Sequence, residues 1–309
     1  MLRKKFHDFR NKLTIGVEEN LRNHYSLLGL NTILTMRSRH EYVKELADAS
    51  IKVYSQWGED GIIDFICEKL NLRTPSFIEF GVGNFDECNS RFIAEARGAS
   101  VIAIDGRNDL IENINKKKIR FRLDIQPIQT WINPQTAKSI FENAIKEKGK
   151  IDIISIDIDG NDYWVLENLN LENTQLVIVE FNPFLGYKKA ITIPRDDNFV
   201  RIEKGIEQDY YGASLLAWIN LMSKKDFTFL GCNIQNTNAF FIKKVNIQDF
   251  VTIQINDLSE YVNCKVRDYR DEESKFNYIS NYQRSLNLVD RNFIDTETMR
   301  MVKFDKSFI

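Results

Sequence analysis

Residues 76–84, Ser-Phe-Ile-Glu-Phe-Gly-Val-Gly-Asn, constrain the fold more than any other stretch of this chain. Their apolar side chains predict a short buried strand, and Gly81 and Gly83 end that strand abruptly. Because glycine has no Cβ, the two glycines permit a tight turn whose backbone N–H groups approach a ligand closely. The stretch therefore predicts a strand that leads directly into a ligand-binding turn.

A helix and a second strand are expected after this turn. Residues 88–97 have a helical pattern with Gly98 as the stop, and residues 100–105 form an apolar strand that ends on Asp105. An acid at that position, 22 residues after Gly83, can bind both ribose hydroxyls of an adenosine cofactor. The order of strand, glycine turn, helix and strand thus predicts cofactor binding. The alternative is an ordinary strand-turn-helix unit whose glycines serve packing.

The acids around the turn discriminate between cofactors. A dinucleotide-binding turn needs a third glycine at position 86, where this chain has Asp86 followed by Glu87, and Glu79 lies within the turn. A pyrophosphate would meet these carboxylates where it needs bare N–H groups. S-Adenosylmethionine has no phosphate, and its cationic sulfonium and amino groups tolerate nearby acids. The turn therefore favours S-adenosylmethionine over NAD.

Composition and charge exclude several classes of function. The formal net charge of −2 and the pI near 6.1 give no overall basic field, which argues against a nucleic-acid partner. No apolar run reaches the roughly 18 residues of a membrane span, and the basic N-terminus lacks the apolar core of a signal peptide. The four scattered cysteines predict free thiols in a reducing compartment. We expect a cytoplasmic protein without a transmembrane segment.

The first 36 residues predict an amphipathic helix with basic residues toward its start. Such a helix can lie on a membrane surface, but acids interrupt its basic face. We favour packing on its own domain or on a second subunit, so this helix is the candidate contact of a homo-oligomer. His7 and His24 lie on it and His40 follows, so a mechanism based on histidine is not expected.

Strands and helices continue to alternate along the chain. Further elements are expected as strands at 120–124, 151–157 and 174–180, helices at 133–148 and 212–222, and a hairpin of 227–232 with 239–242. This order predicts an α/β fold with a doubly wound, seven-stranded mixed sheet. The expected organisation is an N-terminal helical segment at 1–50, a cofactor-binding domain at 51–245 and a C-terminal extension at 246–309 with no assigned element.

Acidic residues gather where four of the expected strands end. In an open parallel sheet, ligands bind beyond the carboxyl ends of the strands. The strand ends carry Glu79, Asp105, Asp157 and Glu180, and Asp159 and Asp162 closely follow Asp157. Charge concentrated at the end of a buried strand needs a partner. A bound cation, a catalytic base or both would explain the pattern.

Two of these motifs resemble known methyltransferase motifs. Residues 156–160, Ile-Asp-Ile-Asp-Gly, with 166–169, Leu-Glu-Asn-Leu, resemble the I-D-V-E-G motif of FkbM-type methyltransferases. The Ser-Gln-Trp-Gly-Glu-Asp segment at 55–60 and segments 84–91 and 209–214 extend the resemblance over about residues 54–243. Glu79-x-Gly81-x-Gly83 resembles the first motif of class I methyltransferases, with Phe85 where a third glycine is frequent.

The resemblance implies a class I, S-adenosylmethionine-dependent O-methyltransferase that acts on a sugar hydroxyl. Similar enzymes are encoded with bacterial capsule and lipopolysaccharide sugar pathways, so the implied acceptor is a nucleotide-activated sugar, with a heptose as one candidate. The expected cofactor-binding residues are Gln56, Glu79, Gly81, Gly83, Asp105, Gly106 and Asp124. The expected catalytic residues are Asp157, Asp159 and Asp162.

The resemblance also raises the question of a metal. Catechol O-methyltransferase and the macrolide-sugar methyltransferases hold Mg²⁺ with acids at the ends of the fourth and fifth strands, where this chain has Asp157 and Glu180. Asn182 would lie near the position of the amide ligand in those enzymes. This chain has Glu-Phe-Asn at 180–182, however, where those enzymes have adjacent Asp-Asp or Asp-Asn. The implied set is Asp157, Glu180 and Asn182. Metal-independent catalysis with an acid as the base is the alternative.

Two further interpretations concern the loop after the fifth strand and the reaction class. Residues 192–199 are long enough for a substrate lid with Arg195 available for a phosphate, or they form a solvated loop. The main rival function is a metal-dependent glycosyltransferase that uses Asp157-Ile-Asp159 as a D-x-D motif. It leaves the glycine turn and Asp105 without a role. A non-catalytic binding module is the third alternative.

Overall fold

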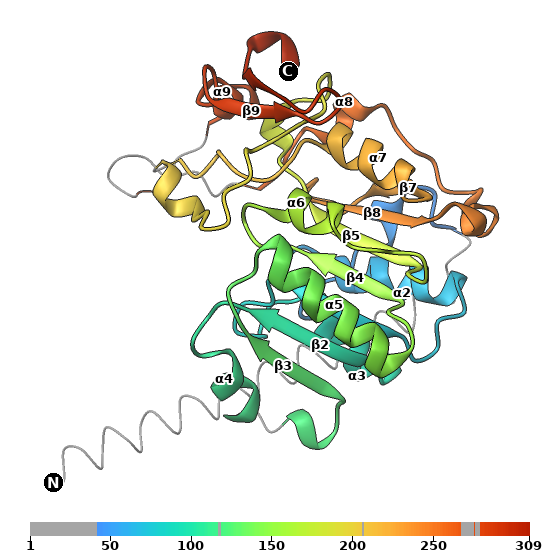
Figure 1. Ribbon diagram of the computed structural model, residues 1–309. Helices are drawn as coiled ribbons and strands as arrows, with labels where there is room; N and C mark the ends of the chain where they lie inside the picture. The colour runs from blue at the N-terminus through green and yellow to red at the C-terminus, as the bar shows by residue number, and fades with distance from the viewer. Residues whose placement is uncertain (1–41, 117–118, 206, 267–274, 276–278) are drawn as a thin grey trace, which may run out of the picture.

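A seven-stranded mixed sheet forms the centre of the computed structural model, which describes residues 42–116, 119–205, 207–266, 275 and 279–309 (Figure 1). Its strands are β1 (Ser76–Phe80), β2 (Ser100–Asp105), β3 (Ile125–Gln129), β4 (Ile153–Ile156), β5 (Leu176–Glu180), β7 (Phe227–Cys232) and β8 (Asn238–Lys243). The order is β3-β2-β1-β4-β5-β8-β7, and β8 is antiparallel to both of its neighbours. The predicted fold class is confirmed. The helix expected at residues 1–36, its three nearby histidines and the oligomer contact assigned to it lie outside the described residues.

Helices cover both faces of this sheet (Figure 1). One face carries η2 (Leu46–Ala49), α2 (Glu59–Lys69), α3 (Ser90–Arg97) and α4 (Leu110–Lys116), and the other carries α5 (Pro134–Lys148), α6 (Asp162–Glu167) and α7 (Leu215–Lys224). In β4, Ile153 packs into the first layer while Ile154 packs into the second. Because both faces are buried, the central strands read as nearly continuous apolar runs.

Helix α5 begins and ends where its sequence predicts. The side chain of Asn133 accepts hydrogen bonds from the N–H groups of Gln135 (3.0 Å) and Thr136 (2.9 Å), and Pro134 occupies the first turn, where no N–H partner is needed. The helix ends at Gly149, whose φ of 81° is in the region that favours glycine.

The third strand differs from the prediction. Residues 119–121 form a short 3-10 helix, η3 (Ile119–Phe121), and β3 starts only at Ile125. Because β3 runs parallel to β2 and Ile125 pairs with Val101, Asp124 lies at the amino end of both strands. There it accepts a hydrogen bond from Ser100, about 17 Å of strand length from the edge that carries Asp105. This position gives the predicted role of Asp124 in cofactor binding no support.

The C-terminal extension packs over the carboxyl edge of the main sheet (Figure 1). It contributes β9 (Asn292–Asp295) and β10 (Arg300–Lys303), which form a second antiparallel sheet with β6 (Ile191–Thr192). The remaining short helices are η4 (Pro183–Leu185), η5 (Arg201–Lys204), η6 (Lys244–Phe250), α8 (Leu258–Tyr261), α9 (Asn281–Leu286) and η7 (Lys306–Phe308). The division at 245/246 stays a prediction, because β6 lies in the domain and β9 in the extension.

Two expectations from composition can be examined in the described part of the chain. All four cysteines are buried free thiols, as predicted. No described helix combines the length and the apolar character that crossing a bilayer requires.

Candidate active site

The turn after β1 requires its first glycine. Gly81 has φ of +94°, and a Cβ at this position would lie 1.6 Å from the backbone oxygen of Asp157. Only glycine therefore allows the ends of β1 and β4 to meet. Gly83 also has a positive φ, +58°, and Phe85, where related turns often have glycine, has φ of +65°. The sequence thus folds into a tight, half-buried loop at the carboxyl edge of the sheet.

Asp105 faces this loop, as predicted. Its Oδ2 accepts a hydrogen bond from the N–H of Gly83 at 2.7 Å and its Oδ1 accepts one from Arg107 at 2.8 Å. Burial raises the pKa of the carboxyl group. Gly106 follows, and a Cβ there would lie 3.4 Å from Cε3 of Trp131, which comes just after β3. We refer to Gly83, Asp105, Gly106 and Trp131 as the cofactor edge.

Glu79 in β1 supports the loop by binding the backbone at the start of α3. Its side chain is 4% exposed, and its two oxygens accept hydrogen bonds from the N–H groups of Asn89 and Ser90, both at 2.8 Å. These N–H groups begin α3, so the carboxylate satisfies donors that a helix leaves unpaired. Burial raises its pKa despite these bonds. The structure therefore gives this predicted cofactor residue two backbone partners in a buried position.

Two further acids hold the 55–60 segment in shape. Oδ2 of Asp60 accepts hydrogen bonds from three consecutive N–H groups, those of Val53 (2.7 Å), Tyr54 (2.6 Å) and Ser55 (2.8 Å). Glu59 accepts hydrogen bonds from the side-chain amides of Asn233 and Asn238 at 2.6 and 2.8 Å and from the N–H of Trp57 at 2.8 Å. The segment bends so that Gln56 and Trp57 line the neighbouring cavity.

Three acids meet at the ends of β4 and β5. Asp157, Asp159 and Glu180 each place a carboxylate oxygen within 4.8 Å of the others, and we call them the acid cluster. Burial raises the pKa of Asp157 well above its usual range, and the charges of Asp159 and Asp162 raise it further. Burial, followed by the charge of Asp157, does the same for Glu180. The expected approach of Asp157 and Glu180 is thus present.

Arg201 supplies a positive charge to this cluster. Its guanidinium pairs with Asp159, lies 3.8 Å from Oε1 of Glu180 and stacks over the ring of Tyr211 at 3.5 Å. The sequence analysis missed Arg201 and singled out Arg195, which pairs instead with Asp197 at 2.8 Å on the surface. A basic residue just beyond the 192–199 insertion was the available signal, but the pattern did not show that the insertion turns back toward β4.

Asp162 and Asn182 serve the backbone. The oxygens of Asp162 accept hydrogen bonds from the N–H groups of Ile158 and Gly160, both at 2.8 Å, and burial raises its pKa to about 6. Asn182 is fully buried; its oxygen accepts from Phe184 N–H at 3.0 Å and its nitrogen donates to two carbonyls. Asn182 lies two residues beyond β5, where the chain enters η4. The backbone therefore engages both polar atoms of Asn182, and Asp159 joins Asp157 and Glu180.

A cavity of about 470 Å³ opens over the acid cluster. Polar and aromatic side chains line it, among them Gln56, Trp57, Arg201, Tyr211 and Asn238. Arg284 of the C-terminal extension also lines it, paired with the buried Asp209 at 2.6 Å and stacked over Phe184 at 3.8 Å. The extension, to which the sequence analysis assigned no element, therefore completes the wall of the cavity.

The strand order, the antiparallel β8 inserted between β5 and β7, and a glycine turn facing an acid at the end of β2 define a class I S-adenosylmethionine-dependent methyltransferase. The model of the methyltransferase FkbM domain matches residues 47–229. This match spans more than half of the chain, so the chain belongs to the FkbM methyltransferase family. The class and family indicated by the motifs are confirmed.

Solved structures resemble the chain only distantly. A Galdieria sulphuraria protein assigned as a sarcosine dimethylglycine methyltransferase is 11% identical, with 54% of this chain and 60% of that chain covered and a TM-score of 0.34. The chain thus spans less than two thirds of that protein. A Staphylococcus aureus protein assigned as a caffeoyl-CoA O-methyltransferase is 17% identical (68% and 91% covered, TM-score 0.40), and a SAM-dependent methyltransferase from Aquifex aeolicus is 11% identical (58% and 86%, 0.33). No curated protein matches the chain.

Proposed function

We propose that this protein transfers the methyl group of S-adenosylmethionine to a hydroxyl oxygen of a sugar. The observation that carries the proposal is the contact between Gly81 and the backbone of Asp157. It places the cofactor turn and the acid cluster at one edge of the sheet, so a methyl donor on the turn faces an acceptor in the cavity. Such an arrangement supplies the alignment on which most of the rate enhancement of an in-line transfer depends.

Asp157 is the proposed proton acceptor. S-Adenosylmethionine supplies an electrophilic methyl group, and the electron pair of its carbon–sulfur bond returns to sulfur. The acceptor oxygen loses its proton to Asp157 as the new carbon–oxygen bond forms. Burial and the neighbouring acids raise the pKa of Asp157, which makes it a stronger base than an exposed carboxylate. Its place directly after β4 fixes its backbone.

The acid cluster also fits a divalent cation. Three carboxylate oxygens within 4.8 Å of one another are the donors that Mg²⁺ prefers, and a bound cation would offset the burial and the acidic neighbours that raise the pKa values of Asp157 and Glu180. Mg²⁺ held by Asp157, Asp159 and Glu180 is therefore the alternative to Asp157 as the base. Its chemistry there would be to bind the acceptor hydroxyl and make that proton more acidic.

The proposed acceptor is a nucleotide-activated sugar of surface polysaccharide biosynthesis. Carboxylates, the amides of Gln56 and Asn238 and the ring of Trp57 line the cavity, and such groups suit the hydroxyls and the apolar faces of sugars. Arg201 and Arg284 provide cations for phosphate groups. The choice of a heptose as one candidate acceptor rests on the family resemblance alone. The glycosyltransferase alternative leaves the cofactor edge without a role and has no support from the family.

Calorimetry with S-adenosylhomocysteine tests the cofactor assignment. The variant Asp105→Ala should bind it more weakly by about 1–3 kcal/mol, because the charge-assisted hydrogen bonds to the ribose are lost. Asp109→Ala is the matched control, since Asp109 is an exposed acid that pairs with Arg107 outside the turn. Equal affinity in the Asp105→Ala variant and the parent would reject the assignment.

A panel of nucleotide-linked sugars, proteins, nucleic acids and small phenols tests the acceptor. S-Adenosylhomocysteine should be released with one or more of the sugars. Release that stops with a chelator and returns with added Mg²⁺ would favour the metal, and release that a chelator leaves unchanged would favour Asp157 as the base. UDP and GDP with Mn²⁺ are included in the calorimetry to test the glycosyltransferase alternative. Turnover confined to the proteins, nucleic acids or phenols would contradict a sugar acceptor.

A further inference from the structure

We propose that Trp131 is a positioning residue that couples the cofactor edge to Arg201 through residues 193–201, which we call the bridging loop. The inference rests on the proposed function, because it assumes a cofactor beside Asp105. It goes beyond that function by giving the 192–199 insertion a role. When a cofactor occupies the cofactor edge, the loop holds Arg201 more firmly. The positive charge of Arg201 offsets the charge of the acid cluster.

The position of Trp131 at the cofactor edge is set by the backbone around it. The N–H of Thr130 donates to the carbonyl oxygen of Asp105 at 2.9 Å, which joins the ends of β2 and β3. The indole ring lies against Gly106, so a side chain at position 106 would meet it. Half of the Trp131 side chain, 50%, is exposed beside the acid that would hold the ribose. An adenosine bound at Asp105 would cover part of this exposed surface.

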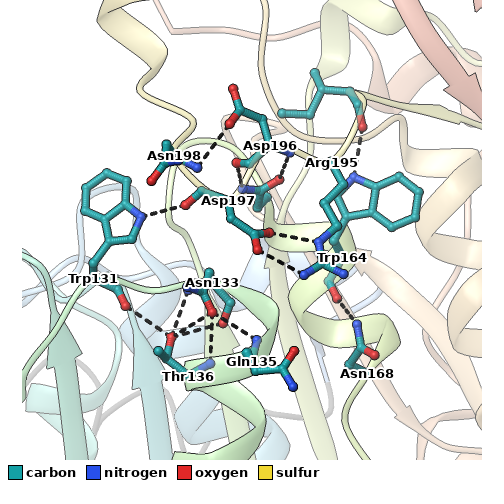
Figure 2. A network of polar contacts seen from close by, with 12 residues as sticks. Trp131, Asn133, Gln135, Thr136, Trp164, Asn168, Arg195, Asp196, Asp197 and Asn198 are labelled. Atoms are coloured by element: carbon teal, nitrogen blue, oxygen red, sulfur yellow. Dashed lines mark hydrogen bonds and ion pairs between the residues drawn. The ribbon is translucent and has the colours of Figure 1, made fainter.

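The polar end of the same indole points at the bridging loop. Its Nε1–H donates to the carbonyl oxygen of Asp197 at 2.8 Å (Figure 2). Because this hydrogen bond is exposed, water competes for both of its partners. A ligand that covers the indole removes some of that water and limits the motion of the ring. Cofactor binding should therefore strengthen the hydrogen bond to Asp197.

The bridging loop is also tied to the acid-cluster side of the sheet. Asn161 exchanges two hydrogen bonds with the backbone of Asp196, and the indole of Trp164 donates to the carbonyl oxygen of Ile193 at 2.9 Å. The ring of Phe199 packs so closely on Gly160 that a Cβ there would lie 2.4 Å from it. The loop thus spans the distance between the end of β3 and the segment that follows β4.

Arg201 ends the bridging loop, four residues after Asp197. Its guanidinium pairs with Asp159 and lies 3.8 Å from Glu180. A loop held more firmly at Asp197 therefore holds Arg201 more firmly against the acid cluster. The connected contacts run from the cofactor edge through Trp131 and Asp197 to Arg201. We infer that the acceptor side of the cavity takes its working geometry after the cofactor has bound.

Hydrogen exchange of the bridging-loop amides, measured with and without S-adenosylhomocysteine, tests the inference. In the parent, saturating ligand should slow exchange in residues 195–201 about fivefold, the order expected for one net hydrogen bond. Trp131→Phe keeps an aromatic ring but has no N–H to donate. It should bind S-adenosylhomocysteine within about threefold of the parent and lose the ligand-dependent slowing.

Trp164→Phe is the matched control, because it removes the other indole N–H that binds this loop. Its loop amides should exchange faster in both states and keep the ligand-dependent slowing. In turnover, Trp131→Phe should raise the acceptor KM and leave the S-adenosylmethionine KM nearly unchanged. A purely structural role for Trp131 would not produce this difference.

The outcomes separate the inference from the proposed function. Binding of S-adenosylhomocysteine without any slowing in the parent, or equal slowing in the parent and Trp131→Phe, would overturn the inference alone. A parent that does not bind S-adenosylhomocysteine at all would overturn the cofactor assignment and the inference with it.

Discussion

Two groups of acids lie near the carboxyl edge of the sheet and differ in what their oxygens contact. Glu59, Asp60, Glu79 and Asp162 accept hydrogen bonds from backbone N–H groups. In the acid cluster, Asp159 pairs with Arg201, and no hydrogen bond among the described residues joins a backbone N–H to the carboxylates of Asp157 or Glu180. The first group shapes loops. In the second group, burial and neighbouring acids raise the pKa values of Asp157 and Glu180, which suits these residues to take up a proton or a cation.

Acids in similar motifs thus differ in how the cost of their burial is offset. Desolvation disfavours the charged form in both groups, and N–H donors offset part of that penalty in the first. In the acid cluster the neighbouring groups are mostly other acids. A bound proton, Arg201 or a metal ion must therefore offset the desolvation penalty of these carboxylates. The number of backbone donors around a carboxylate, more than its motif, therefore separates a supporting acid from a reactive one.

The largest expected effect concerns the reactive group. Asp157→Asn keeps the size of the side chain but removes its ability to accept a proton, so turnover should fall by about 10²–10⁴-fold. The melting temperature and the affinity for S-adenosylhomocysteine should stay close to those of the parent, because Asp157 supports no described loop. A folded, cofactor-binding variant with nearly normal turnover would remove Asp157 from the mechanism.

The supporting group should show the opposite pattern. Glu79→Ala leaves the N–H groups of Asn89 and Ser90 without their partner and opens a buried space, so it should lower the free energy of unfolding by about 2–4 kcal/mol. Asp159→Ala should lower it by less than about 0.5 kcal/mol, because Asp159 is exposed. Urea denaturation of both variants measures the difference. Similar losses of unfolding free energy in Glu79→Ala and Asp159→Ala would contradict the distinction between the two groups of acids.

Stability should depend on pH through the supporting acids. Burial raises the pKa of Asp60 to about 7 and that of Asp162 to about 6, so the folded state binds their protons more tightly than the unfolded chain does. Stability should therefore fall as the pH rises from about 4 to about 7 and level off above that, where both states have lost these protons.

Melting temperatures measured between pH 5 and pH 8 test this smaller effect. The parent should melt at a higher temperature at pH 5 than at pH 8. Asp60→Asn should flatten the profile, because the amide does not titrate. A parent that becomes more stable as the pH rises over this range would show that other groups dominate.

Local patterns predict the elements whose signals are contained in short stretches. The turn at Gly81 and Gly83, the position of Asp105 and the meeting of Asp157 with Glu180 all follow from apolar strands that end at the same edge. The strand predicted at 120–124 is wrong, because Phe121 belongs to the 3-10 helix η3 and is 90% exposed. That shift of β3 placed Asp124 at the wrong edge and concealed Trp131.

The residues that the sequence does not reveal reach the site through distant packing. Arg284 joins Asp209 across 75 positions of the chain, and Arg201 joins Asp159 across 42. Neither pair has a spacing that a helical or strand period could indicate. The β6–β9 pairing, which brings the extension over the cavity, also depends on tertiary contacts and not on local preference.

Arg284 is synthesised after every strand of the main sheet, so the parts of the site are made in a fixed order. A ribosome adds about 5–20 residues each second, so Lys243, the end of the last strand of the main sheet, is made about 2–8 s before Arg284. In that interval the nascent chain contains every strand of the cofactor edge but lacks one wall of the cavity. If the proposed sites are right, the growing protein completes its donor site before its acceptor cavity.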